Sequence, residues 1–160
     1  MKSKKIIGCL IGTALFAVLA GCGKTQVNSV TALTKDGFIS KVESDYNYND
    51  QSDVYSQSYD SMTSVVTVYP ESVAWSLDFF EFVDDASAED MFKSYQDSIQ
   101  SMSEDNQKVV NIDNGAVVTA DYNNTYYYAA RVGNTLVYSA SSDDNKADVE
   151  ALLVKLGYRK

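Results

Sequence analysis

The residue types that most often carry catalysis are scarce in this sequence of 160 residues. It contains no histidine and two cysteines, Cys9 and Cys22. A histidine-based catalytic triad, a histidine-liganded zinc site and an imidazole acid–base catalyst are therefore excluded. The chemistry left to the chain is acid–base work by carboxyl groups, oxygen ligation of a hard cation, or binding.

Carboxylates are the most abundant acid–base groups, with 22 aspartates and glutamates in the chain. Two of them could hydrolyse a glycosidic bond if the fold held them at a defined separation across a cleft. Asp78, Glu81 and Asp121 are the acids whose joint inward orientation would favour such a hydrolase. A short single domain offers little cleft, so we expect the chain not to be an enzyme and keep this hydrolase as the alternative.

One acidic and amide-rich segment offers oxygen ligands for a cation. Asp45, Asn47 and Asn49 form a D-x-N-x-N pattern, with Asp53 at the ninth place. Calcium prefers several such oxygens on one flexible loop. However, an aspartate stands where an EF-hand loop has its turn-making glycine, and a serine stands where it has its bidentate glutamate. We therefore expect a solvated loop with no metal or cofactor, and a weak calcium-binding module is the alternative.

The 12 tyrosines are the best candidates for a binding surface. Tyrosine gives a large contact area and a hydroxyl group at low entropic cost, which suits surfaces that bind proteins or glycans. The alternative is that the rings fill the core or cover the edges of a sheet. The candidate binding residues are Tyr46, Tyr48, Tyr55, Tyr126 and Tyr128.

Arg131 is a further candidate, because it is expected on an otherwise apolar sheet face near a turn. A buried arginine needs a carboxylate partner, and that pair could serve the structure or hold an anionic ligand. The alternative that we favour is an arginine whose guanidinium reaches water at the rim of the sheet.

The N-terminus has the layout of an export signal. Three lysines precede an almost unbroken apolar run over residues 6–20. A basic segment before a short apolar segment is typical of a secretory signal peptide, whereas a permanent membrane helix needs about 20 apolar residues. The sequence therefore predicts a signal peptide over residues 1–21, a tether over 22–32 and a single domain over 33–160.

The apolar run ends in Leu19-Ala20-Gly21-Cys22, which resembles the lipobox of bacterial lipoproteins. The resemblance covers residues 1–22. It implies that the Cys22 thiol receives a diacylglyceryl group, with fatty acyl chains such as palmitate, and that signal peptidase II cuts between Gly21 and Cys22. The expected location is the outer face of the bacterial cytoplasmic membrane. Cys9 would leave with the signal peptide, so the mature chain could form no internal disulfide.

The net charge of the chain limits the classes of partner that it can bind. The chain has a formal charge of −9, and loss of the three lysines of the signal peptide would make it −12. Such a surface repels nucleic acid and anionic lipid headgroups. We therefore expect no nucleic-acid partner, a domain that stands off the membrane, and an envelope protein or glycan as partner.

Capping residues and apolar stripes predict three helices. Thr34 and Ser87 are candidate N-caps, and Gly157 is a candidate stop. The helices are expected over residues 35–45, 88–102 and 145–156.

Two β-rich runs, residues 64–69 and 73–83, predict strands. In the second run the apolar alternation changes phase after Phe79, which indicates a bulge there. Residues 47–62 show no helical period and are interpreted as a loop, with one ragged edge strand as the alternative.

The clearest pattern lies between Lys108 and Ser141. Two-residue turn signals separate β-rich runs and predict a four-strand antiparallel meander. Its register places Tyr122 opposite Thr125 and Val132 opposite Thr135. The turn signals are Asn114-Gly115, Asn123-Asn124 and Gly133-Asn134. The face taken as inner carries Ala116, Val118, Ala120, Tyr127, Ala129, Leu136, Tyr138 and Ala140. The face taken as solvent-exposed carries Thr119, Asp121, Tyr126, Tyr128 and Ser139.

The predicted fold class is α+β, with an antiparallel sheet and helices packed on one face. The stretch from Tyr126 to Leu136, with its tyrosine-rich strand and Arg131-Val132-Gly133-Asn134-Thr135, is similar to the C-terminal part of small lipoproteins of low-GC Gram-positive bacteria. This similarity implies an address and no activity. The expected function is a membrane-anchored, extracytoplasmic, non-catalytic binding or accessory domain. The alternatives are the hydrolase, acting on envelope glycans, and the weak calcium-binding module.

Overall fold

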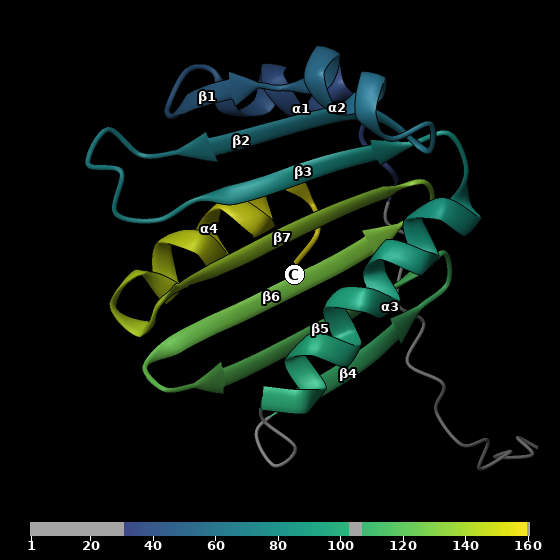
Figure 1. Ribbon diagram of the computed structural model, residues 1–160. Coiled ribbons are helices and arrows are strands. Elements are labelled where there is room, and N and C mark those ends of the chain that lie inside the picture. Colours follow the sequence, from purple (N-terminus) through teal and green to yellow (C-terminus); the bar gives the residue numbers. More distant parts are fainter. Residues whose placement is uncertain (1–30, 103–106, 160) are drawn as a thin grey trace, which may run out of the picture.

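The computed structural model describes residues 31–102 and 107–159. These residues form a seven-stranded antiparallel sheet and four α-helices (Figure 1). The expected signal peptide, the lipobox with Cys22 and most of the expected tether lie outside the described residues. Within the described ranges, no helix has both the length and the apolar character needed to span a membrane.

The sheet has the strand order β1-β2-β3-β7-β6-β5-β4. Its strands are β1 (Asn47–Asp50), β2 (Met62–Tyr69), β3 (Leu77–Phe82), β4 (Gln107–Ile112), β5 (Gly115–Tyr122), β6 (Thr125–Val132) and β7 (Thr135–Ser142). The helices are α1 (Lys35–Val42), α2 (Ser52–Ser58), α3 (Asp85–Met102) and α4 (Lys146–Leu156).

The predicted α+β class and the four-strand meander are confirmed. Tyr122 pairs with Thr125 across β5 and β6, and Val132 pairs with Thr135 across β6 and β7, in the expected register. Asn123 and Asn124 both have positive φ, at 50° and 59°. That conformation is what a type I′ turn requires of its two central residues, and asparagine tolerates it better than most residues.

The turn between β4 and β5 lies one residue earlier than predicted. Ile112 pairs with Gly115, so the turn residues are Asp113 and Asn114. Gly115 is instead a strand residue, and a Cβ built there would lie 1.8 Å from the carbonyl oxygen of Arg131. Glycine is needed at this position for a close approach of two backbones rather than for the turn.

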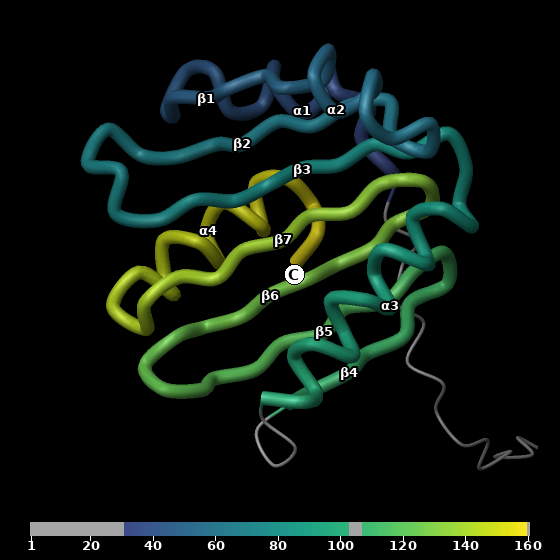
Figure 2. The backbone as a smooth tube through the Cα atoms, in the orientation of Figure 1, coloured from purple at the N-terminus to yellow at the C-terminus, as the bar shows by residue number. Residues whose placement is uncertain are grey.

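The prediction that the helices pack on one face of the sheet is wrong, because helices cover both faces. In Figure 2, α3 crosses in front of the sheet and α4 lies behind it. The α3 side buries Ala116, Val118, Ala120, Ala129 and Leu136 with Phe92 and Ile99 of the helix. The opposite side buries Val66, Phe79, Tyr126, Tyr128 and Val137 with Phe38 of α1 and Leu152 and Leu153 of α4. The strands carry apolar side chains on both faces of the sheet, so each face needs helices to cover it.

The bulge expected near Phe79 is also absent from β3. Leu77 and Phe79 point to the α1 and α4 side, whereas Phe80 and Phe82 point to the α3 side, in regular alternation. A strand that is buried on both faces carries apolar residues at consecutive positions. In the sequence this looks like a change of phase in the apolar alternation, although the strand is regular. The irregular pairing lies instead in β2, between Met62 and Ser64.

Residues 47–62, interpreted as a loop, contain the edge strand β1 and the short helix α2. The edge strand matches the alternative, and α2 was not predicted.

Two of the three predicted helix-end residues, Thr34 and Gly157, are confirmed, but Ser87 is wrong as an N-cap. It lies within α3, and Asp84 caps that helix by accepting a hydrogen bond from the backbone N–H of Ser87 at 2.8 Å. The hydroxyl of Thr34 accepts a hydrogen bond from the backbone N–H of Gly37 at 3.2 Å, and α4 ends at Gly157 with φ of 89°.

The two ends of the described chain meet beside the start of β7. The hydroxyl of Tyr158 lies 2.7 Å from Oγ1 of Thr135, and it accepts a hydrogen bond from the backbone of Leu33. Burial raises the pKa of Tyr158 to about 12, so this phenol is neutral in ordinary conditions. The residues before α1 and after α4 are thereby fixed to the same strand.

Candidate binding surface

Tyrosines gather on the α3 side of the sheet, on a surface bordered by α2 and α3. Tyr95 of α3 stacks on Tyr138 of β7, with ring centroids 4.2 Å apart and planes inclined by 19°. Tyr55 of α2 and Tyr127 of β6 pack against the same core cluster as this stacked pair. All four rings are half-buried against the core of this side. We call Tyr55, Tyr95, Tyr127 and Tyr138 the tyrosine face.

The strands place the polar groups of this surface in one row across the sheet. Thr67 of β2 pairs with Asp78 of β3, and Asp78 pairs with Tyr138 of β7. Residues that pair across antiparallel strands point to the same side of the sheet. Thr67, Asp78 and Tyr138 are all partly exposed, so this row reaches the surface of the α3 side. Figure 1 shows α3 in front of the sheet on this side.

Asp78 is the acidic group of the tyrosine face. One oxygen of its carboxylate accepts a hydrogen bond from the hydroxyl of Thr67 at 2.7 Å. Burial raises the pKa of Asp78, and the Thr67 hydrogen bond only partly opposes this effect. No lysine or arginine among the described residues forms an ion pair with it. The carboxylate therefore remains an acceptor for donors that a ligand brings.

The stacked phenols of Tyr95 and Tyr138 are held in the neutral form. Burial raises the pKa of Tyr95 to about 12, and the charge of Asp78 adds to the effect. Burial likewise raises the pKa of Tyr138, with contributions from Tyr127 and Asp78. At neutral pH these hydroxyls can both donate and accept hydrogen bonds. The surface thus combines flat apolar area, phenol hydroxyls and one carboxylate.

The expected exposure of Tyr126 and Tyr128 is wrong. Both rings are at most 2% exposed, because the face expected to be exposed is a second core beneath α4. Their hydroxyls are used internally: that of Tyr128 donates to the carbonyl oxygen of Tyr158 at 2.7 Å, and that of Tyr126 accepts from Arg159 at 3.1 Å. Burial raises the pKa of both phenols.

The other predicted tyrosines do not share one surface. Tyr46 packs edge-on against Trp75 on the α4 side, and Tyr48 is exposed on the edge strand β1. Of the five predicted tyrosines, Tyr55 alone belongs to the tyrosine face.

Arg131 lies on the α3 side, as expected, and is mostly buried. Its guanidinium lies 3.7 Å from the carboxylate of Glu89 in α3, and it donates to the carbonyl oxygen of Gly133 at 3.3 Å. The favoured reading of an arginine at the rim is therefore wrong, and the reading with a carboxylate partner holds. The pair ties α3 to β6.

The segment with calcium-like spacing is not a loop. Asn47 and Asn49 are exposed on β1, which pairs with β2. Asp45 binds Lys155 at 2.6 Å, and Asp53 lies in the first turn of α2. In the part of the chain that the structure describes, no three or more histidine, cysteine, aspartate or glutamate residues are grouped to hold a metal ion.

The three acids considered for a hydrolase do not meet. Asp78 points to the α3 side and Glu81 to the opposite side, three positions along the regular strand β3. Asp121 forms an ion pair with Lys146. The residue of β5 that stands in the same cross-strand row as Glu81 is Gly115, and Asp121 lies about 20 Å further along that strand.

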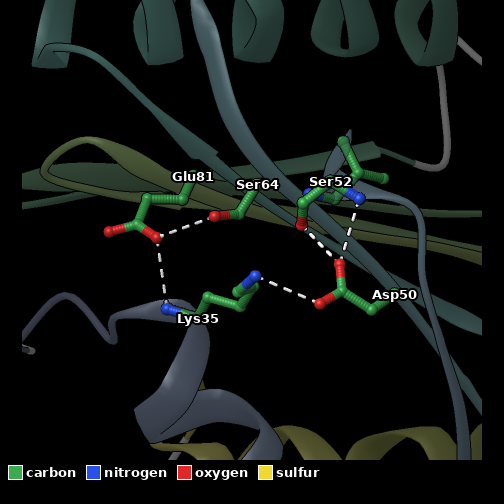
Figure 3. A network of polar contacts seen from close by, with 6 residues as sticks. Lys35, Asp50, Ser52, Ser64 and Glu81 are labelled. Atoms are coloured by element: carbon green, nitrogen blue, oxygen red, sulfur yellow. Dashed lines mark hydrogen bonds and ion pairs between the residues drawn. The ribbon is translucent and has the colours of Figure 1, made fainter. Parts of the chain in front are cut away.

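The carboxylate of Glu81 links α1 to the sheet, as Figure 3 shows. This carboxylate accepts from the backbone N–H of Lys35, at the start of α1, and from the hydroxyl of Ser64, each at 3.2 Å. The ammonium of Lys35 in turn binds Asp50 at 3.1 Å, and Asp50 accepts from Ser52. A carboxylate at a helix N-terminus favours the helix. This network fastens α1 to β1, β2 and β3.

Comparison with known proteins gives no relative for this chain: no family model, no curated protein and no solved structure matches it. The functional argument rests on the site itself.

Sequence reasoning missed three of the four tyrosines of this face. Tyr127 and Tyr138 were correctly placed on one side of the meander, but that side was taken for the inner face, and Tyr95 was not singled out within the helix predicted over residues 88–102. The available signal was the bulk of these rings opposite the small residues Ala120 and Ala129. This pairing shows that the rings have room on that side of the sheet, but it does not report how far α3 covers them, so their partial exposure could not be predicted.

Proposed function

We propose that the chain is an extracytoplasmic lipoprotein, anchored through a diacylglyceryl group on Cys22 to the outer face of the bacterial cytoplasmic membrane. Its domain is a non-catalytic binding or accessory module for an envelope protein. The lipobox resemblance of residues 19–22 and the basic and apolar segments before it support the address. The tyrosine face supports the binding role.

The tyrosine face is the observation that carries this proposal. Four half-buried rings and one carboxylate that forms no ion pair with any described residue lie together on the α3 side of the sheet. Tyrosines are enriched at the centres of protein interfaces, because they bury large area while losing few rotamers. The acceptor on Asp78 and the phenol hydroxyls supply the polar contacts that orient a partner.

The hydrolase and the calcium module have less support. Asp78, Glu81 and Asp121 lie too far apart or on opposite faces, so none of them forms the carboxylate pair that glycoside hydrolysis uses. The oxygen ligands of the D-x-N-x-N segment are spread over an extended strand and a helix.

The address is tested by intact-mass analysis of membrane fractions from cells that make the wild type or Cys22→Ala. We expect the wild type to begin at Cys22 and to carry a diacylglyceryl mass, which the variant lacks. An unmodified wild-type chain released from the membrane would contradict the anchor.

The binding role is tested by photo-crosslinking in intact cells with benzoylphenylalanine at the position of Tyr127. The matched control carries the same group at Val154, which is 51% exposed on α4. We expect a discrete protein adduct from the Tyr127 position only, weakened by a second change of Tyr138 to Ala. Equal adducts from both positions, no adduct, or an adduct that glycosidases remove would contradict a protein partner.

A further inference from the structure

The side of the sheet opposite the tyrosine face carries a separate cleft. The helix α4 packs over β6 and β7 and leaves β4 and β5 uncovered on its own side. The resulting cleft has a volume of about 650 Å³, within the range of roughly 300–1,000 Å³ typical of small-molecule sites. We call Val110, Val117 and Thr119 the cleft floor.

The strand register explains the order of groups in the cleft. Val110 of β4 pairs with Val117 of β5, and the next row on the same side joins Lys108 to Thr119. The floor thus offers two valines with a lysine ammonium beside them. The rings of Tyr126 and Tyr128 close the side toward α4.

The charges of the cleft are paired with one exception. Lys146 binds Asp121 at 2.7 Å, and Arg159 binds Glu150 at 2.8 Å, so these four groups compensate one another. Lys108 forms no ion pair with any described residue, although it also lines the cleft. The cleft therefore carries one uncompensated positive charge on a chain whose formal charge is −9.

We propose that this cleft binds a small amphipathic monoanion, with a flat apolar body on the cleft floor and one anionic group at Lys108. The apolar body gains from burial on Val110 and Val117. The low polarity of the floor strengthens the attraction between the anion and the ammonium group. Lys108 makes the potential at this cleft less repulsive to an anion than the formal charge of −9 on the whole chain would give.

The test uses naphthalene-2-sulfonate as the probe and naphthalene-2-sulfonamide as its neutral counterpart. Both are titrated, by ligand-observed NMR, against the full chain held in nanodiscs of zwitterionic lipid, with empty nanodiscs as the blank. We expect saturable binding of the sulfonate at one site. Binding no stronger than to empty nanodiscs would overturn the proposal.

Variants locate the site. Lys108→Gln should weaken the sulfonate about fivefold and leave the sulfonamide unchanged, as loss of one partly exposed charge contact predicts. Lys93→Gln, on α3, is the matched control and should change neither. Thr119→Trp should fill the cleft and abolish binding of both probes. An unchanged affinity of the sulfonate for Lys108→Gln would overturn the proposal.

A second variant guards against a folding defect in Thr119→Trp. Val110 is 37% exposed, so Val110→Glu leaves the core intact and should repel the sulfonate more than the sulfonamide. If Tyr138→Ala lost the sulfonate while Val110→Glu still bound it, the probe would lie on the tyrosine face, and the proposed cleft site would be refuted. The photo-crosslink from the Tyr127 position should survive Thr119→Trp, so the two proposals stand or fall separately.

Discussion

The two faces of this sheet use the same strands for opposite chemistry. On the α3 side, Tyr95 and Tyr138 of the tyrosine face lie near the Asp78 carboxylate, which forms no ion pair with any described lysine or arginine. On the α4 side, cations line a cleft in which the carboxylates are already paired. Neighbouring residues of one strand, such as Tyr127 and Tyr128, contribute to the tyrosine face and to the wall of the cleft, respectively. One layer of backbone is thus enough to separate two distinct environments, and each can change without the other.

The largest expected effect comes from the core that holds α4 against the sheet. Leu152 is fully buried, so Leu152→Ala should lower the free energy of unfolding by about 2–5 kcal/mol. It should also loosen the wall of the cleft while leaving the tyrosine face in place. Urea unfolding measures the loss, and Val154→Ala on the exposed side of the same helix should stay within about 0.5 kcal/mol of the wild type.

A smaller loss is expected at the backbone contact between β5 and β6. In Gly115→Ala the new methyl group would meet the Arg131 carbonyl, so the strands must separate, at a cost of about 1–3 kcal/mol. Amide hydrogen exchange should show faster opening of β4 and β5, which carry the cleft floor. Exchange that accelerates in β2 and β3 alone would contradict this assignment.

Most substitutions lower the stability of a protein, but removing the charge of Asp78 should raise it. The pKa of Asp78 is raised in the folded state, so the folded chain binds a proton more tightly than the unfolded chain does. Stability is therefore lost as the pH rises from the unfolded pKa through the raised folded pKa. Asp78→Asn should be more stable than the wild type at pH 7, and the difference should vanish at pH 3, where both side chains are neutral.

Asp45 provides the matched control for that experiment. The hydrogen bond from Lys155 lowers the pKa of Asp45, so this carboxylate stabilises the fold above its ordinary pKa and ceases to do so as the pH falls through the lowered value. Asp45→Asn should thus be less stable than the wild type at pH 7, opposite in sign to Asp78→Asn. If urea unfolding gave both variants a stability change of the same sign, this distinction would be refuted.

Asp78→Asn should also weaken the photo-crosslink from the tyrosine face, since a stabilising change at a binding site removes a group kept for its ligand.

The smallest effect is expected from an exposed ion pair at the rim of the cleft. Lys146 and Asp121 are both partly solvated, so Lys146→Gln should change the free energy of unfolding by less than about 1 kcal/mol. Thermal unfolding at low and high salt measures this, and the difference from the wild type should shrink at high salt. A larger loss that persists at high salt would show that the pair is part of the core.

The sequence predicted the parts of the fold that depend on neighbouring residues. Turn chemistry at Asn123-Asn124 and Gly133-Asn134 set the register of β5, β6 and β7, and Thr34 and Gly157 marked the ends of their helices. The side of the sheet on which a helix packs depends on contacts between distant segments, and no local pattern reports these. A face with Thr119, Asp121 and Ser139 was therefore taken for a solvated one.

The same limit explains the candidate sites. Tyr126 and Tyr128 were given a binding role because the face they share was expected to be exposed, and α4 covers them. Asp78 and Thr67 were not linked by any sequence spacing, since β2 and β3 meet only when the hairpin closes.

The cleft depends on the position of α4 over β6 and β7, which no sequence spacing reports. Tyr126, Tyr128 and Asp121 line it, but the sequence pointed to them for other reasons, and it did not point to Lys108, Val110 or Val117 as members of a site.

The meeting of the two chain ends at Thr135 has a mechanical consequence. Leu33 and Tyr158 are joined through one phenol hydroxyl, and the first turn of α1 is held by Glu81. A pull on the N-terminal side therefore acts on several strands together: on β7 through Leu33 and Tyr158, on β2 and β3 through Glu81, and on β1 through the ion pair of Lys35 with Asp50. Because the force is shared among these strands, no single strand has to carry it alone.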